Sequence, residues 1–338
     1  MCICAHECSS AATIPIGLRR RHSMGRLKKL EVAHRPLTST EVYNQVKGIE
    51  TFIGKPTSEV DRPTGLWNKQ SIFWKLPYWK DLKVKNCLDV MHIEKNVCEA
   101  ILATLMNIPG KTKDVKASRL YLEKQGLRPE LWAQKRDGRK KKIVEERVDD
   151  ETHKSKNKVE DSEKNYLPPA CYTISRAEKR IFCESLYGIK VPTGYSSNMK
   201  RFVTLNGELK LSSMKSHDCH VMIQVFLLIA IRGILPKHVR HTIKELCSFF
   251  HTICSKVQES STLDSLQARV VETLCKFEMY SPPAFFDIMV HLIVHIVREI
   301  KLCGLVFLRW CYPFERFMGT LKDKVSNNKM DLHVGITS

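Results

Sequence analysis

The sequence predicts a mostly α-helical protein, and three observations carry that prediction. Apolar residues recur at helical spacing in several segments, a Ser or Thr followed three residues later by Glu opens two of them, and Gly or Pro separates them. The chain has 338 residues and is 43% apolar, which is enough to bury a sizeable core. We therefore expect packed helices.

The clearest helical signals lie in the second half of the chain. Ser175 and Glu178 form a capping box, and Gly188 marks the end of the helix that follows it. Glycine, proline and serine-threonine clusters then separate four longer apolar periods. These predict helices at residues 217–232, 237–258, 263–279 and 284–302.

The first half carries weaker signals. Thr38 and Glu41 make a second capping box ahead of a brief helix. The aromatic stretch GLWNKQSIFWKLPYWKDL, residues 65–82, is predicted to pack across a core surface before a helix that begins near Leu88. A surface that stacks nucleic-acid bases is the alternative.

Composition divides the chain. Between residues 135 and 165 charges of both signs dominate and aliphatic residues are scarce, so this segment cannot bury enough surface to offset its ordering entropy. We predict a disordered linker there. Residues 1–65 are predicted to be basic and poorly ordered, and residues 327–338 to be a tail.

The formal net charge of +19 predicts a polyanionic partner, and double-stranded DNA bound weakly and without sequence preference is the expected one. Two basic clusters stand out, one at residues 19–29 and a smaller one at residues 139–142. For each, a nuclear import signal or a solvated face is the alternative interpretation. The candidate nucleic-acid-binding residues are Arg19, Arg20, Arg21, Arg26, Lys28 and Lys29.

The expected compartment is inside the cell. The N-terminus MCICAHECSS lacks the basic start and the apolar stretch of a secretory signal. The longest apolar runs, at 221–231 and 288–297, are shorter than the roughly 20 residues of a membrane span. Thirteen cysteines, an odd number without a regular framework, are predicted to be reduced thiols packed as small apolar groups.

The stretch LDVMHIEKN, residues 88–96, raises the question of a catalytic site. On a helix that starts near Leu88, Asp89, His92, Asn96 and Glu99 fall on one narrow stripe, and the apolar residues between them point elsewhere. An acid and a histidine one turn apart can hold a metal or relay a proton. The wet side of an amphipathic helix produces the same pattern, and the residues alone favour it.

Other donor-rich patterns are weaker, and none predicts a metal site or a resident cofactor. The N-terminal C-x-C-x-H-x-C pattern lacks the usual two-residue gap between zinc ligands, and the two histidine pairs have no evident third ligand, so satisfied core histidines are expected. These patterns are Cys2, Cys4, His6 and Cys8; His217 with His220; and His291 with His295.

Longer segments resemble a known family. LPYWKDLKVKNCLDVMHIEKNVCEAILATLMNIPGKTKD, residues 76–114, resembles the end of the transposase domain of plant CACTA (En/Spm) elements. Four further segments resemble the domain of unknown function that follows the transposase in these proteins. They are KSHDCHVMIQ at 215–224, ILPKHVR at 234–240, SPPAFFDIMVHLIVHIVREIKLCG at 281–304 and RWCYPFERFMGTLK at 309–322.

The resemblance implies an RNase H-like catalytic core in which acidic residues hold two divalent metals. Residues 66–134 would be the C-terminal fragment of that domain, a partial RNase H-like remnant, and residues 166–326 a helical transposase-associated domain. Asp89 and His92 resemble the family's late D-x-x-H pair, and Glu315 is the candidate final acid. The early aspartates lie upstream of the preserved stretch, so these three residues are expected to be vestigial.

The leading functional hypothesis is a truncated, transposase-derived nuclear protein that at most binds DNA or a full-length transposase. Mg²⁺ is expected only if the chain is catalytically active. An active metal-dependent transposase or nuclease is one alternative, and a domesticated protein-interaction module is another. The sequence leaves the oligomeric state open.

Overall fold

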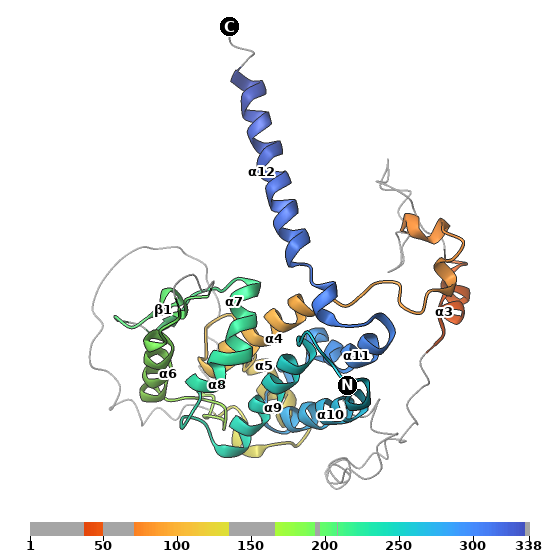
Figure 1. The fold of residues 1–338 in the computed structure, drawn as a ribbon. Helices are drawn as coiled ribbons and strands as arrows, with labels where there is room; N and C mark the ends of the chain where they lie inside the picture. The colour runs from red at the N-terminus through yellow and green to blue at the C-terminus, as the bar shows by residue number, and fades with distance from the viewer. Residues whose placement is uncertain (1–36, 50–70, 135–165, 193–196, 208, 335–338) are drawn as a thin grey trace, which may run out of the picture.

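The structure is a computed structural model that describes residues 37–49, 71–134, 166–192, 197–207 and 209–334. The basic segment at 1–36, the predicted linker at 135–165 and the Cys2–Cys8 pattern lie outside the described residues. Helices dominate the described part, as predicted (Figure 1). Its strands are a short antiparallel pair, β1 (Val203–Thr204) and β2 (Lys210–Leu211).

The α-helices keep the labels of Figure 1. None of those in the described ranges combines the length and the apolar content that a membrane span requires. Their bounds are α3 (Ser39–Val46), α4 (Val90–Leu105), α5 (Lys116–Lys124), α6 (Arg176–Gly188), α7 (Ser216–Val221), α8 (Leu227–Ala230), α9 (Lys237–Ile253), α10 (Leu263–Tyr280), α11 (Ile288–Cys303) and α12 (Tyr312–Val334).

Both capping boxes form as predicted. The Thr38 hydroxyl accepts from the backbone N–H of Glu41, whose carboxylate accepts from the backbone N–H of Thr38. Ser175 and Glu178 make the same pair at the start of α6, and the hydrogen bonds from Ser175 lower the pKa of Glu178. Local chemistry therefore fixes these two helix starts.

Three of the predicted helices differ in detail. The segment expected at 217–232 is α7 and α8 joined by a π-helical turn, Met222–Phe226. Helix α9 ends at Ile253 because Gln258 donates to the last carbonyl groups and turns the chain. Helix α11 starts only at Ile288 because a 3₁₀ turn, Pro283–Phe285, precedes its cap Asp287.

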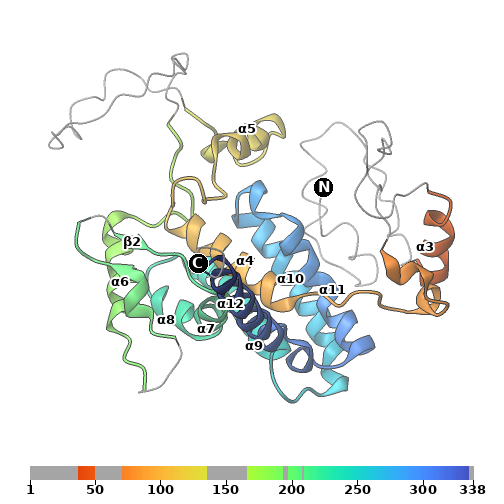
Figure 2. The same cartoon turned by 90° about the horizontal axis from the view of Figure 1, so that it is seen from above.

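Helix α4 lies at the centre of the core, in contact with α7 and α11 (Figures 1 and 2). Its apolar residues Val90, Ile93, Val97, Ile101 and Leu105 are buried, as the helical period predicts. One continuous hydrophobic cluster includes residues of α4 and of α6 to α11. Described residues from both predicted segments, 66–134 and 166–326, therefore belong to the same hydrophobic cluster.

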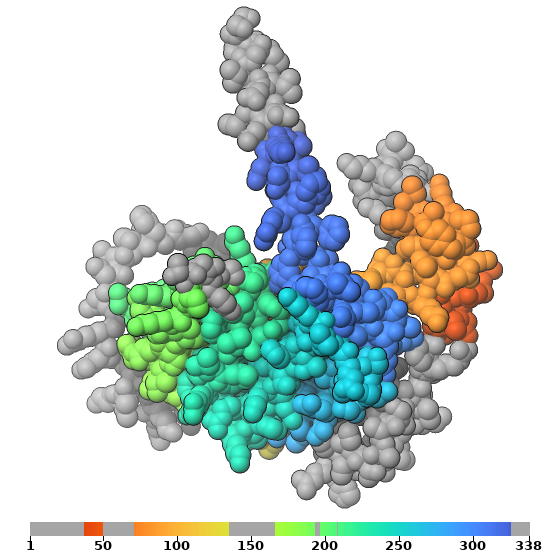
Figure 3. All heavy atoms as spheres, in the orientation of Figure 1, coloured from red at the N-terminus to blue at the C-terminus, as the bar shows by residue number. Residues whose placement is uncertain are grey.

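The aromatic stretch packs differently from the prediction. Trp79 is buried, but it stacks on Phe73 at 5.2 Å and lies outside the main hydrophobic cluster. Trp74 stacks on Tyr43 of α3 at 5.5 Å. Figure 3 shows this segment and α3 beside the main body. The aromatic residues form a small satellite with α3, because their nearest apolar partners are one another.

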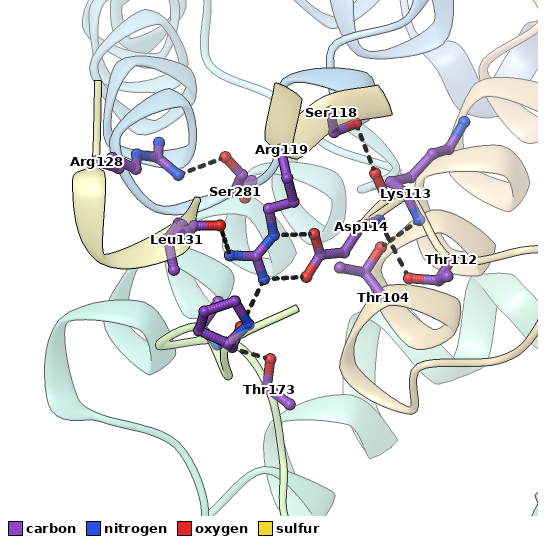
Figure 4. A network of polar contacts seen from close by, with 12 residues as sticks. Thr104, Thr112, Lys113, Asp114, Ser118, Arg119, Arg128, Leu131, Thr173 and Ser281 are labelled. Atoms are coloured by element: carbon purple, nitrogen blue, oxygen red, sulfur yellow. Dashed lines mark hydrogen bonds and ion pairs between the residues drawn. The ribbon is translucent and has the colours of Figure 1, made fainter. Parts of the chain in front are cut away.

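A buried arginine fastens α5 to the body (Figure 4). The Arg119 side chain is 1% exposed, and it donates from Nε and Nη2 to the two carboxylate oxygens of Asp114 at 2.6 and 2.7 Å. It also donates to the carbonyl oxygens of Leu131 and Pro168. A bidentate ion pair supported by two further hydrogen bonds is a geometry in which a buried charge is tolerated.

Replacing Arg119 by Met should lower the free energy of unfolding by about 3–5 kcal/mol, because the Asp114 carboxylate would keep its burial without its cation. Chemical denaturation of the full chain measures this. Arg180→Met is the control, since Arg180 pairs with Glu184 at 3.7 Å on the exposed face of α6 and should cost less than about 1 kcal/mol. Equal losses for the two variants would contradict the anchoring role.

Candidate functional site

The residues expected at a catalytic stripe lie on the exposed start of α4. Asp89 is the N-cap, and its carboxylate accepts from the backbone N–H of His92 at 3.1 Å. His92 is exposed, and its carbonyl oxygen accepts from the Asn96 side chain at 2.8 Å. Asp89 thus has a local structural task, which is to satisfy a free N–H of the first helical turn.

Glu315 lies in the first turn of α12 and is exposed. The structure brings it to the same edge of the molecule as Asp89. Burial raises the pKa of the Cys311 thiol, and the negative charges of Asp89 and Glu315 raise it further. The two carboxylates, at positions 89 and 315, therefore influence the pKa of the same thiol although they are 226 positions apart in the sequence.

Two other aspartates that could substitute as metal-binding acids have structural partners. Asp218 is buried and accepts from the Ser197 hydroxyl at 3.0 Å and from Arg201 at 3.1 Å. Asp287 caps α11 and pairs with Lys113 at 2.8 Å. Asp218 is therefore an ion-pair partner in the first turn of α7, and Asp287 is both the cap of α11 and an ion-pair partner.

A different polar cluster is buried beneath the start of α12. Glu94 of α4 is 2% exposed, and its Oε2 lies 2.7 Å from Nδ1 of His220 on α7. Gln224 donates to the other carboxylate oxygen of Glu94 at 3.2 Å, and its amide nitrogen lies 3.1 Å from the same imidazole nitrogen. Glu94, His220 and Gln224 therefore form a closed triangle of polar contacts inside an apolar core.

The π-helical turn helps to build this triangle. Gln224 belongs to the turn, while His220 precedes it in α7. A π turn widens the helix locally and changes the direction in which the following side chains point. Such turns are frequent at functional sites, and here the turn places the amide of Gln224 against both His220 and Glu94.

A cysteine and a tyrosine complete the cluster, and a tryptophan packs beside it. Cys254, the C-cap of α9, offers a sulfur within 4.8 Å of ligand atoms on Glu94 and His220. The Trp310 ring meets the His220 ring edge-on at 5.3 Å. The buried Tyr312 hydroxyl has no hydrogen-bond partner within the part of the chain that the structure describes. We call Glu94, His220, Gln224, Cys254 and Tyr312 the buried polar cluster.

Burial and the charge of Glu94 set the protonation of this cluster. Burial raises the pKa of the Cys254 thiol well above its ordinary value, and Glu94 raises it further. The same two causes, in the same order, raise the pKa of the Tyr312 hydroxyl above its ordinary range and that of Cys247 to about 12. The thiols and the phenol are therefore neutral at physiological pH and can donate protons.

Sequence reasoning missed Glu94, Gln224 and Cys254, although one signal was available. Glu94 lies four residues after Val90 and three before Val97, so it belongs to the apolar face of α4 and not to the polar stripe. An acid on a buried face needs a partner. His220 was considered with His217 as a ligand pair but was expected to be a satisfied core histidine. Its partners come from α4 and α9 and are distant in sequence.

A second group of ligand-type side chains lies where the end of α11 meets the segment before α4. Cys87, Glu299 and Cys303 bring their ligand atoms within 4.8 Å of one another. Glu299 already accepts from the backbone N–H of Leu88 at 2.7 Å and pairs with Arg309 at 3.2 Å. Here Arg309 supplies the positive charge. The hydrogen bond from Leu88 to Glu299 ties α11 to the start of α4.

The remaining histidine pair lies on α11. Nε2 of His295 is 3.1 Å from Nε2 of His291, and the two rings meet edge-on. Burial lowers the pKa of His295, and the charge of Arg298 lowers it further. The two half-buried imidazoles thus share a hydrogen bond, as expected for satisfied histidines.

The cysteines agree with the predicted reduced state. Every cysteine in the described ranges is a free thiol, and most are buried. Cys98 and Cys219 share a hydrogen bond beside the buried polar cluster, which together with burial raises the pKa of Cys98. These thiols act as small core residues.

Comparison with known proteins places the C-terminal part of the chain. A family model described as "Domain of unknown function (DUF4218)" matches residues 253–334, from the end of α9 through α12. This domain occurs in plant transposase-related proteins. No curated protein and no solved structure matches the chain. The matched range contains Cys254, Trp310 and Tyr312, whereas Glu94 and His220 precede it.

Replacing Glu94 by Ala should lower the free energy of unfolding by about 3 kcal/mol, because His220 and Gln224 would lose their buried acceptor. Glu99→Ala is the matched control on the same helix, where the side chain is half-buried and a change within about 0.5 kcal/mol is expected. Urea unfolding of both variants measures the difference. An unchanged free energy of unfolding in Glu94→Ala would show that the cluster adds nothing to stability.

Proposed function

We propose that this chain is a transposase-derived protein of CACTA type that works by binding, in the nucleus, and does not cut DNA itself. Its partners would be double-stranded DNA and a second chain of the same family. The resemblance of residues 76–114 and 215–322 and the family match at 253–334 support the origin. The observation that carries the binding role is the surface of α12.

Helix α12 projects from the body (Figures 1 and 3), and all of its described side chains from Pro313 to Val325 are exposed. A helix of 23 residues is about 34 Å long. Gly319 lies within it, and glycine costs about 1 kcal/mol relative to alanine in a helix interior. Most helical stability in proteins comes from the packing of an apolar face, so a partner surface would stabilise α12.

The exposed apolar residues of α12 have coiled-coil spacing. Phe314, Met318, Leu321 and Val325 are separated by four, three and four residues, and each is between 39% and 72% exposed. Phe317, also exposed, widens the same stripe. Alternating spacings of three and four align side chains along one face, where they pack into the face of another helix. A second α12 presents the same stripe and is therefore a suitable partner.

Replacing Met318 and Leu321 together by Ser should convert a dimer into a monomer, because it removes the middle of the apolar stripe. Light scattering coupled to size-exclusion chromatography, at several protein concentrations, measures the mass. Arg316→Ser with Asp323→Ser is the matched control, since both residues are exposed on the opposite face of α12. A wild-type chain that stays monomeric throughout would refute self-association.

The positions of the acids support binding without cleavage. Two-metal cleavage needs several carboxylates that converge on ions about 4 Å apart. In the part of the chain that the structure describes, two groups of three ligand-type residues converge, and neither contains Asp89 or Glu315. Asp89 instead caps α4.

Purified chain should therefore not nick supercoiled plasmid DNA with either Mg²⁺ or Mn²⁺. Agarose gels after long incubation measure the nicked fraction. Asp89→Asn separates the two roles of this residue, because asparagine still caps a helix but carries no charge. Nicking by the wild-type chain that disappears in Asp89→Asn or Glu315→Gln would show that the acids are catalytic.

The charge of the chain supports DNA as the second partner. The formal net charge is +19, and a basic face is also present among the described residues. On α9, Lys237, His241 and Lys244 are exposed at spacings of four and three, so they share one face of the helix. The first turn of α9 contains no acid. Glu245, the acid beside this face, pairs with His241 at 3.2 Å and with Lys276 at 3.1 Å. Phosphate groups can therefore contact Lys237 and Lys244.

Binding to duplex DNA should be weak, independent of sequence and steeply salt-dependent. Replacing Arg19, Arg20 and Arg21 by Ala should weaken it equally for all sequences and reduce the slope of log K against log salt by about 0.9 per lost phosphate contact. Fluorescence anisotropy at several salt concentrations measures both. Lys237→Ala with Lys244→Ala tests the α9 face in the same way. Tight binding to one sequence that survives high salt would contradict the proposal.

A further inference from the structure

The buried polar cluster contains three metal-ligand types that meet from three separate elements. Glu94 comes from α4, His220 from α7 and Cys254 from the end of α9. One ligand atom of each lies within 4.8 Å of those of the other two. Glu94 and Cys254 are buried and His220 is half-buried. From this arrangement we infer that Glu94, His220 and Cys254 bind a zinc ion.

The donor set selects zinc over the harder cations. Thiolate sulfur, imidazole nitrogen and carboxylate oxygen are the three zinc ligands of proteins, whereas Mg²⁺ and Ca²⁺ prefer oxygen donors alone. Zinc bonds to these atoms are about 2.0–2.3 Å long. Ligand atoms within 4.8 Å of one another need only small side-chain rotations to reach such distances. The site therefore differs in class from a two-magnesium DNA-cleavage site.

Electrostatics of the cluster favours a cation. Among the ion pairs of the described residues, Glu94 has one partner, His220, which is charged only when protonated. A buried carboxylate without a full counter-charge is destabilising. A divalent ion would balance Glu94 and the Cys254 thiolate together. On binding, the S–H bond of Cys254 breaks, a sulfur–zinc bond forms, and the proton leaves to solvent.

The surroundings provide the outer contacts that zinc sites use. The Gln224 amide donates to Glu94 at 3.2 Å and would hold the carboxylate in position. The Tyr312 hydroxyl is buried, and among the described residues it has no hydrogen-bond partner. This hydroxyl could hydrogen-bond to a water molecule in the fourth zinc position. Trp310 covers the imidazole ring from the side of α12.

The other group of ligand types suits zinc less well. In Cys87, Glu299 and Cys303, the carboxylate already pairs with Arg309 at 3.2 Å, and the guanidinium would repel a cation. Cys87 is also exposed. The buried polar cluster is therefore the better site, and its ion would join α4, α7 and α9 beneath the first turn of α12.

Zinc content of the full chain tests the inference. The background carries Cys2, Cys4 and Cys8 replaced by Ser, so that these N-terminal donors cannot contribute. After zinc loading and dialysis, elemental analysis should find about one zinc per chain, as expected for a single site with three protein ligands. Cys254→Ser should lose it, and Cys183→Ser, the control at a buried thiol of α6, should keep it. Gln224→Ala should weaken zinc binding about 10–100-fold.

Cobalt substitution gives a readout that does not depend on a destabilised variant. Wild-type chain loaded with Co²⁺ should develop thiolate-to-cobalt charge-transfer absorption, and His220→Gln should change the accompanying ligand-field bands. Wild-type chain without zinc or this absorption would overturn the inference. So would zinc retained at full stoichiometry in Cys254→Ser, or zinc lost in Cys303→Ser while Cys254→Ser keeps it.

Discussion

Packing of α4 against α7 and α11 is the contact on which the rest of the structure depends. Twelve of the sixteen residues of α4 are buried, so the helix has almost no free surface beyond its capped start. Its partners lie more than 100 positions later in the chain. Removing α4 would expose apolar faces on both neighbours, which is why the two halves of the sequence form one folding unit.

Buried charges then fix how the helices are oriented. Glu94 meets His220, Arg119 meets Asp114, and Glu299 meets Arg309, each inside or at the edge of the apolar core. Hydrophobic burial is nondirectional, whereas a charge out of water requires a partner at a defined distance. The apolar faces hold the helices together, and these pairs restrict the rotation and register that each helix can adopt.

The proposed function assigns binding roles to two exposed surfaces of the protein. Helix α12 presents an apolar stripe away from the core, and α9 presents a basic face. The buried polar cluster lies below the start of α12 and includes its first residue, Tyr312. The Trp310 ring meets the rings of both His220 and Tyr312. A zinc ion in that cluster would therefore stabilise the base from which the partner-binding helix projects.

The sequence alone determined the helical class, both capping boxes and the buried face of α4, because caps and apolar periods depend on residues within a few positions of one another. It also identified Asp89 and His92, but not that Asp89 caps a helix. Only the tertiary structure decided that Glu94, His220 and Cys254 meet, and that the aromatic stretch packs on α3. Helical periodicity specifies which face of a helix is buried, but the residues opposite that face come from distant segments, and their identity depends on how the whole core packs.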